Sequence, residues 1–195
     1  MSTARSSETI DLDEPKEQEV LVELHASGMC HSDEHIVTGD MPFALPCIGG
    51  HEGAGVVKAV GSHVSWIEPG DHVVFSFIPS CGRCPSCSSG HQNLCDLGAK
   101  IYSGKQIQDG TARHHIRNQD LSLACGIGSF AKHTVVNEAS CIKIDDDIAE
   151  HDLVAVRWRA TECSGISVVR LLAGKLVDGD RATGEAVTGR TGEDH

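Results

Sequence analysis

Four cysteines lie close together in the run CGRCPSCSSGHQNLC, and they are Cys81, Cys84, Cys87 and Cys95. Two-residue spacers separate the first three, and the fourth returns after a loop of seven residues. Four thiolates suit tetrahedral Zn²⁺, because a d¹⁰ ion imposes no other geometry and each sulfur is deprotonated on binding. The spacing therefore predicts a structural zinc in a small lobe over residues 79–97.

Two other interpretations of the cysteine run are weaker. An iron–sulfur cluster of the bacterial ferredoxin type has a tighter fourth spacing, three residues and then a proline. Disulfides are disfavoured because Gly82, Pro85 and Gly90 suit a loop folded around a metal. The first residues also carry no apolar core of a secretory signal.

A second candidate metal centre comes from two separate loops. Cys30 begins the run CHSDEH, and His51 lies in GGHEGAG. Taken singly, such a cysteine is more often a small buried hydrophobe, and such a histidine is more often an ordinary polar residue. The metal interpretation depends on the polar neighbours within a few residues, which are Ser32, Asp33, His35 and Glu52. An acid beside a ligating histidine fixes its tautomer, and a hydroxyl beside a metal is placed to pass a proton.

Composition limits the class of protein. The 195 residues include 28 acids and 16 bases, with a formal net charge of −12, which argues against a nucleic-acid partner. No run of 18 apolar residues is present, so the sequence predicts no membrane span. Nine cysteines and twelve histidines are better explained by metal than by disulfides in a reducing compartment. We expect a soluble, cytoplasmic protein with one domain and a tail.

Short strands are the main elements that the hydrophobic pattern predicts. Apolar and polar residues alternate between glycines or prolines in five segments, which are 19–25, 53–64, 70–77, 130–136 and 140–144. Residues 19–154 are therefore expected to form a mainly β domain after a partly ordered segment, 1–18. Helix signals appear first at 145–156, where three aspartates offer a cap. Residues 155–195 lack sustained hydrophobic periodicity, and this pattern predicts a poorly ordered tail.

These motifs together resemble the zinc-dependent medium-chain alcohol dehydrogenases over about residues 10–154. Gly50, His51, Glu52, Gly55 and Gly61 match the family's zinc signature, and the cysteine run matches its structural-zinc lobe. The phrases VLVELHASGMCHSDEH and GHQNLCDLGA are similar to the actinobacterial nicotinoprotein branch, which uses N,N-dimethyl-4-nitrosoaniline as electron acceptor. The resemblance implies a GroES-like, partly open β-barrel with a zinc lobe.

The resemblance also implies roles for single residues. Cys30 and His51 correspond to two ligands of the catalytic zinc, and Ser32 to the hydroxyl that accepts the proton of the alcohol. His35 corresponds to the histidine that delivers this proton to solvent. Asp33 corresponds to the carboxylate that orients His51, and Glu52 corresponds to the acid behind the zinc. His31 corresponds to a residue that contacts the cofactor pyrophosphate. The implied reaction converts an alcohol to an aldehyde or ketone, with hydride passing to NAD.

The chain departs from the family pattern after residue 154. The third zinc ligand of the family is a cysteine there, and only Cys163 is available in the run AVRWRATECSG. No strand–Gly-x-Gly-x-x-Gly–helix unit follows, so a Rossmann domain is expected to be absent, and with it most of the family's oligomer interface. The run from Gly126 to Ala131 is rejected because a predicted strand follows it. The isolated chain is therefore expected to be inactive, because hydride transfer requires a nicotinamide held near the zinc. The alternative hypothesis is a truncated or frameshifted zinc-binding remnant without turnover.

The other histidines and cysteines carry no ligand spacing. We expect no chemical role for the histidines at 25, 63, 72, 91, 114, 115 and 133. Cys47, Cys125 and Cys141 are expected to be core thiols, because their sequence neighbours are apolar.

Overall fold

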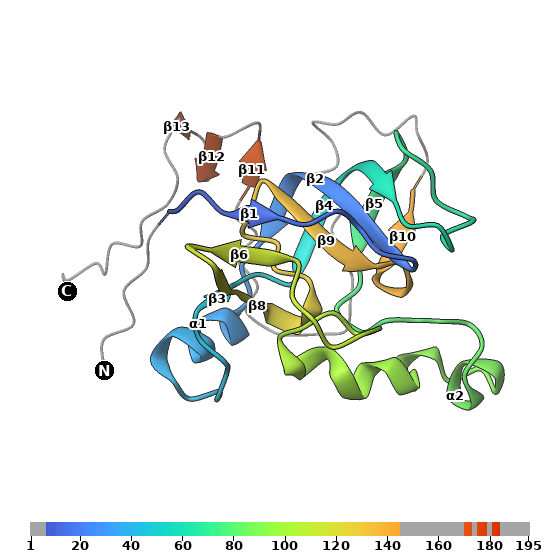
Figure 1. The fold of residues 1–195 in the computed structure, drawn as a ribbon. Coiled ribbons are helices and arrows are strands. Elements are labelled where there is room, and N and C mark those ends of the chain that lie inside the picture. The colour runs from blue at the N-terminus through green and yellow to red at the C-terminus, as the bar shows by residue number, and fades with distance from the viewer. Residues whose placement is uncertain (1–6, 145–169, 173–174, 179–180, 184–195) are drawn as a thin grey trace.

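The structure is a computed structural model that describes residues 7–144 and three short strands at 170–172, 175–178 and 181–183. Its centre is an antiparallel five-stranded sheet (Figure 1). In spatial order its strands are β10 (Cys141–Lys143), β5 (His72–Phe75), β4 (Glu52–Val60), β2 (Glu19–Gly28) and β9 (His133–Asn137). All five of the predicted strand segments appear in this sheet, although residues 61–64 lie outside β4. The mainly β fold class is confirmed.

The pairing of β2 with β4 decides where the second candidate metal centre lies. Val20 pairs with Val60 at one end of this ladder, and Gly28 pairs with Glu52 at the other. The register is irregular at two points, between Leu21 and Val22 and after Leu24, which bends the strands. Cys30 follows the end of β2 and His51 precedes the start of β4. The antiparallel pairing therefore brings the two residues to the same end of the ladder.

The core of the sheet consists of two clusters of buried side chains, of which the smaller contains Ala26, Ala54 and Val74. Its largest cluster of buried side chains consists of Val20, Val22, Val57, Ile67, Val73, Phe75, Ile127, Val136 and Cys141. Strand residues contribute most of these, at alternate positions, as the period of a half-buried strand requires. The burial of these apolar side chains needs no metal.

Two smaller sheets lie beside the central one. Strands β1 (Asp11–Leu12), β6 (His114–Ile116) and β7 (Gln119–Asp120) form an antiparallel sheet, while β3 (Cys47–Ile48) pairs in parallel with β8 (Ser122–Leu123). A buried ion pair fastens the loop before β6 to the central sheet: Nε and Nη2 of Arg113 donate to the two carboxylate oxygens of Glu19 over 2.8 and 2.7 Å. Both side chains are 1% exposed.

The helices are short. They are α1 (His31–Thr38) and α2 (Pro85–Ser88), with 3₁₀ turns η1 (Gln92–Leu94), η2 (Asp96–Ser103), η3 (Ala124–Gly126) and η4 (Glu138–Ser140). The sequence pattern did not predict α1, because Asp33 is its single buried residue and it has no apolar stripe. Its signals are acids in the first turn and Gly39, which ends the helix with φ of 85°. No helix among the described residues is long and apolar enough to cross a membrane.

Two expectations concern the C-terminal part. The predicted helix at 145–156 lies outside the described residues. Strands β11 (Arg170–Leu172), β12 (Lys175–Asp178) and β13 (Arg181–Thr183) form an antiparallel sheet, whereas the sequence predicted no strand in this region. The rejection of the run from Gly126 to Ala131 as a nucleotide-binding turn agrees with the fold, because strand β9 follows it.

Candidate metal centres

The four cysteines of the 79–97 lobe converge on one point. Their sulfurs all lie within 4.8 Å of one another. Sγ of Cys81 is 4.0 Å from that of Cys87, and Sγ of Cys84 is 3.9 Å from that of Cys95. A tetrahedral zinc with Zn–S bonds of about 2.3 Å separates its sulfurs by about 3.8 Å. The separations are thus those of a tetrathiolate site, and they are too long for disulfide bonds.

Backbone N–H groups point at the sulfurs of this lobe. The N–H of Cys84 donates to Sγ of Cys81 over 3.4 Å, and the N–H of Cys87 donates to Sγ of Cys84 over the same distance. The N–H of Asp96 also donates to Sγ of Cys84, at 3.5 Å. Such donors stabilise thiolates, because they favour the charged form of the acceptor. The two-residue spacers thus create turns that aim both sulfur and N–H groups inward.

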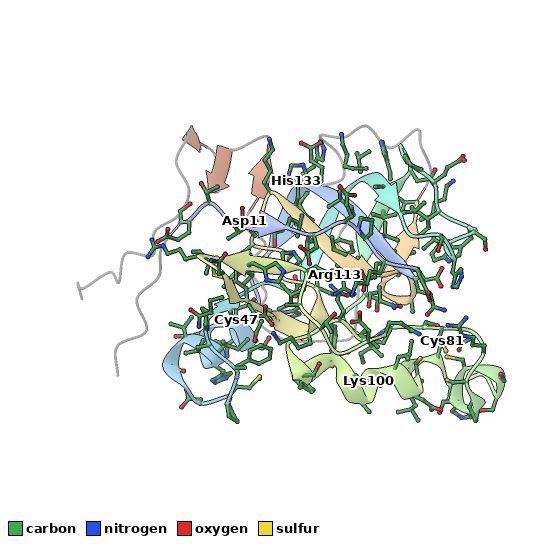
Figure 2. All side chains as sticks on the ribbon, viewed as in Figure 1. Asp11, Cys47, Cys81, Lys100, Arg113 and His133 are labelled. Atoms are coloured by element: carbon green, nitrogen blue, oxygen red, sulfur yellow. The ribbon has the colours of Figure 1, made fainter. Side chains whose placement is uncertain are left out.

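Little besides the cysteines holds the lobe. Its buried residues are Pro79, Cys87 and Cys95, whereas Leu94 is 63% exposed. Helix α2 contributes one turn, in which Cys84 caps the N-terminus and Pro85 occupies the first helical position. In Figure 2, Cys81 of the lobe and Cys47 lie on opposite sides of the fold, and Figure 1 shows α1, which follows Cys30, on the side away from α2 of the lobe.

The second candidate centre brings Cys30, His51 and Glu52 together at the end of the β2–β4 ladder where Gly28 pairs with Glu52. Their ligand atoms lie within 4.8 Å of one another, and Cys30 and His51 are 8% and 7% exposed. Cys30 is the residue that precedes α1, and His51 is the residue that precedes β4. The start of α1 therefore positions the thiol of Cys30, and the start of β4 positions the imidazole of His51.

Asp33 ties these two ends together. Its Oδ2 accepts a hydrogen bond from the backbone N–H of Cys30, and its Oδ1 accepts one from the N–H of Gly50, each over 3.0 Å. Nδ1 of His51 lies 3.4 Å from the same Oδ1. A carboxylate at Nδ1 directs the other ring nitrogen, Nε2, toward the centre.

Three further side chains surround the imidazole of His51. Oγ of Ser32 lies 3.4 Å from Nε2, and Oε1 of Glu52 lies 4.0 Å from it. The ring of Phe77 meets that of His51 edge to face, with 5.8 Å between centroids. The centre therefore has one apolar wall and one hydroxyl on its polar side.

Electrostatics at this centre favours an ionised cysteine. Burial by itself raises the pKa of the Cys30 thiol, but hydrogen bonds from Ser32 and the neighbouring His51 lower it below its usual value. Burial likewise lowers the pKa of His51, yet Asp33 and Cys30 outweigh it and raise this pKa to about 9. Burial raises the pKa of Glu52. The thiolate is the form in which cysteine ligates a metal.

His31 and His35 lie on the outer side of α1. Their side chains are 66% and 43% exposed. His31 pairs with Glu34, and His35 pairs with Asp40. Within the described residues, no direct hydrogen bond joins Ser32 to His35, so the predicted transfer of a proton between them stays a prediction. Cys163, the candidate third ligand, lies outside the described residues.

Glycines at two positions make room for this centre. A Cβ atom on Gly28 would lie 2.3 Å from Oε2 of Glu52. Gly50 has φ of 83°, and a Cβ there would lie 2.4 Å from Oγ of Ser129. Gly50 was predicted only as part of the zinc signature, and Gly28 was not predicted as a site residue. Its place opposite Glu52 in the β2–β4 ladder is the signal that a strand register could have supplied.

Three further thiols and His114 lie in largely buried surroundings. Cys141 is buried, which raises its pKa, and burial raises the pKa of Cys47 and of Cys125 to about 12. His114 is fully buried, and burial lowers its pKa to about 4. Cavities of about 530 and 400 Å³ lie beside Arg113 and between Phe77 and Tyr102. Neither is lined by Cys30 or His51, although Phe77 also contacts the ring of His51.

Comparison with known proteins gives consistent matches over this region. The family described as alcohol dehydrogenase GroES-like domain matches residues 16–146. The chain is 48% identical over 144 residues to alcohol dehydrogenase B of Mycobacterium tuberculosis (strain ATCC 25618 / H37Rv), which covers 73% of this chain and 38% of that protein. It is 45% identical over 139 residues to the NDMA-dependent alcohol dehydrogenase of Amycolatopsis methanolica, covering 71% of this chain and 37% of that protein.

A solved structure shares the same fold. An alcohol dehydrogenase zinc-binding domain protein from Burkholderia ambifaria superposes with a TM-score of 0.64 at 34% identity, over 70% of this chain and 37% of that one. The chain thus spans about 38% of the length of the first curated relatives that it matches.

Proposed function

Because this chain belongs to the alcohol dehydrogenase GroES-like domain family, we propose that residues 19–154 are the catalytic domain of a zinc-dependent alcohol dehydrogenase. The proposed reaction oxidises an alcohol to an aldehyde or ketone and passes a hydride to a nicotinamide. The observation that carries this proposal is the convergence of Cys30, His51 and Glu52 within 4.8 Å, with the hydroxyl of Ser32 beside them.

The donor sets of both centres match the chemistry of zinc. Four thiolates form a closed structural site, whereas one cysteine and one histidine on separate elements leave positions for further ligands. We propose that the four-cysteine lobe holds a structural zinc and that Cys30 and His51 hold a catalytic one, with Cys163 as the candidate third ligand. When bound at Cys30 and His51, zinc supplies a Lewis acid that lowers the pKa of an alcohol.

The residues of the chain then divide the work around the substrate. Asp33 orients the imidazole of His51 through Nδ1, so that Nε2 faces the centre. The hydroxyl of Ser32 is the group placed to accept the proton of the alcohol. His35 is exposed and is the proposed group that releases this proton to water. Glu52 supplies a negative charge behind the thiolate and imidazole ligands.

The cofactor and the substrate are proposed from the family. Relatives named as alcohol dehydrogenases support a small alcohol or aldehyde as substrate. We propose NAD(H) as the hydride carrier and exposed His31 as a contact for its pyrophosphate. Phe77 forms an apolar wall beside His51, which suits the carbon atoms of an alcohol.

Turnover of the purified chain tests this function. The chain is loaded with zinc and supplied with an alcohol, NAD⁺ or NADH, and N,N-dimethyl-4-nitrosoaniline, and aldehyde formation is measured. The isolated chain itself is expected to be inactive; any turnover that is measured should depend on zinc and should fall by about 10²- to 10⁴-fold in Ser32→Ala, the range for loss of a general acid–base group. Ser103→Ala is the control, because Ser103 is an exposed hydroxyl residue outside this centre whose side chain bonds to backbone groups of Lys105.

Metal analysis separates the proposed enzyme from the alternative. Zinc bound at both centres without any turnover would support the alternative hypothesis of a zinc-binding remnant. Zinc bound only at the four cysteines would contradict the proposed catalytic centre itself.

A further inference from the structure

Two imidazoles lie next to each other on the outer surface of α1. His31 and His35 are one helical turn apart, and their ring centroids are 4.7 Å from each other, with 59° between the ring planes. Residues at i and i+4 of a helix are neighbours on one face, so their side chains can reach the same ligand. The side chains of His31 and His35 are 66% and 43% exposed, on a helix whose buried residue is Asp33.

We propose that His31 and His35 form a separate, exchangeable binding site for a divalent cation that prefers imidazole, such as Zn²⁺, Ni²⁺ or Cu²⁺. Imidazole nitrogen is a strong ligand for these ions. With 4.7 Å between the ring centroids, the two imidazoles are close enough for rotation of the side chains to bring one nitrogen of each to the same ion. Water molecules complete the coordination, because the site is open to solvent.

Two carboxylates support the site. Oε2 of Glu34 lies 2.8 Å from Nε2 of His31, so a cation bound at this nitrogen replaces the shared proton and keeps the carboxylate beside it. Oδ2 of Asp40 lies 3.3 Å from Nδ1 of His35, and the hydroxyl of Thr38 donates to the same oxygen over 2.7 Å. Asp40 therefore fixes the ring and leaves Nε2 of His35 for the metal, as carboxylates commonly do behind ligating histidines.

The site is distinct from the centre at Cys30 and His51. Cys30 is 8% exposed, and its neighbour Asp33 is 7% exposed, whereas both histidine rings face water. The formal net charge of −12 also favours the approach of a cation. A metal on His35 would occupy a nitrogen that the proposed function needs for proton release. This consequence depends on the proposed function, but the binding site itself does not.

Nickel binding to the zinc-loaded chain tests the site. Calorimetric titration with Ni²⁺ is compared for the wild-type chain and for His31→Gln, His35→Gln and the double variant. Loss of an outer partner alone typically weakens metal binding by about 10- to 100-fold, so loss of either imidazole is expected to weaken it by at least about tenfold. The matched control is His63→Gln, because His63 is an exposed histidine paired with one acid, Glu17, at 3.4 Å.

Each outcome of the titration has a meaning. If both single variants bind Ni²⁺ more weakly to the same degree, and the double variant binds it no more weakly than either, the result would support one ion shared by two rings. Broadening of the His31 and His35 ring signals by paramagnetic Ni²⁺ in NMR spectra would support the same conclusion. Equal binding by wild type and His31→Gln, or an equal loss in His63→Gln, would overturn the proposal.

Discussion

The cysteine lobe and the centre at Cys30 and His51 are both candidate metal sites, but they are built in different ways. In the lobe, the sulfurs are the main buried groups, and N–H groups of adjoining turns point at them. At the second centre, strand ends and a buried carboxylate position the ligands, and the strands belong to an apolar core. The lobe is thus expected to need its metal in order to fold, whereas the second centre is formed by the sheet.

The largest expected effect that follows from this difference is the loss of the lobe in Cys95→Ser. Structural zinc contributes folding free energy directly, on the order of 10 kcal/mol in small zinc domains. We expect the variant to lose one zinc and to lose amide protection over residues 81–97 in hydrogen exchange.

The matched variant for this prediction is Cys30→Ser. It is expected to lose metal at its own centre while the central sheet keeps its amide protection. If both variants lost the same protection, the distinction between the two kinds of site would be wrong.

The second effect tests whether the barrel is stable without metal. Glu19→Ala removes the bidentate partner of the buried Arg113 guanidinium, which stays paired with Asp109 over 2.7 Å. Breaking a buried pair typically costs about 3–5 kcal/mol, and we expect a loss at or below the lower end of this range. We expect this loss in denaturant unfolding of both zinc-loaded and chelator-treated protein. Glu23→Ala is the control, because its partner Lys58, at 3.0 Å, is half-exposed and such a pair contributes about 0–1 kcal/mol. A loss that zinc abolished would contradict metal-independent barrel stability.

The third effect concerns acid and the buried His114. Burial lowers the pKa of His114 to about 4, so in the folded chain it stays neutral while the unfolded chain takes up a proton near pH 6.5. The free energy of unfolding is therefore expected to decrease as pH falls from about 6.5 to 4, by about 3 kcal/mol at most. His114→Gln is expected to flatten this part of the stability curve. His63→Gln should keep the wild-type slope, and an unchanged slope in His114→Gln would contradict the assignment.

The smallest effect is expected for Asp33→Asn. An amide can replace one of the two accepting oxygens of the carboxylate but leaves a backbone N–H without its acceptor, at about 1–3 kcal/mol. Loss of the carboxylate behind His51 is expected to weaken metal binding at that centre by about 10- to 100-fold. Zinc affinity and unfolding free energy are the measurements. Unchanged zinc affinity would mean that Asp33 acts only on the backbone.

The sequence predicted the central sheet well because its strands are amphipathic. The segment EVLVELH alternates over residues 19–25, and β2 extends from Glu19 to Gly28. Helix α1 was missed because burial of one aspartate gives no apolar period. The ion pair of Glu19 with Arg113 also escaped prediction, because 94 residues separate the partners and no local pattern joins them.

The family resemblance is confirmed by the match over residues 16–146. For the candidate sites, the sequence named the cysteine quartet and the residues around Cys30 and His51, and the fold brings the ligand atoms of each set together. The roles of Ser32, His35 and Glu52 stay predictions. What spacing could not supply is the arrangement of Asp33, whose two oxygens accept N–H groups from Cys30 and Gly50, because this depends on how α1 meets β4.

The carboxylate of Asp33 is also expected to affect how fast metal binds at the Cys30 and His51 centre. Asp33 joins the chain around Cys30 to the chain around His51 as soon as β2 and β4 have paired. Metal that arrives afterwards meets ligands already held in place, so the rate of filling is set by encounter with the ion. In the lobe, each sulfur has to be gathered around the ion as it binds. The two centres should therefore load at different speeds, and a pulse of scarce metal should reach the Cys30 and His51 centre first.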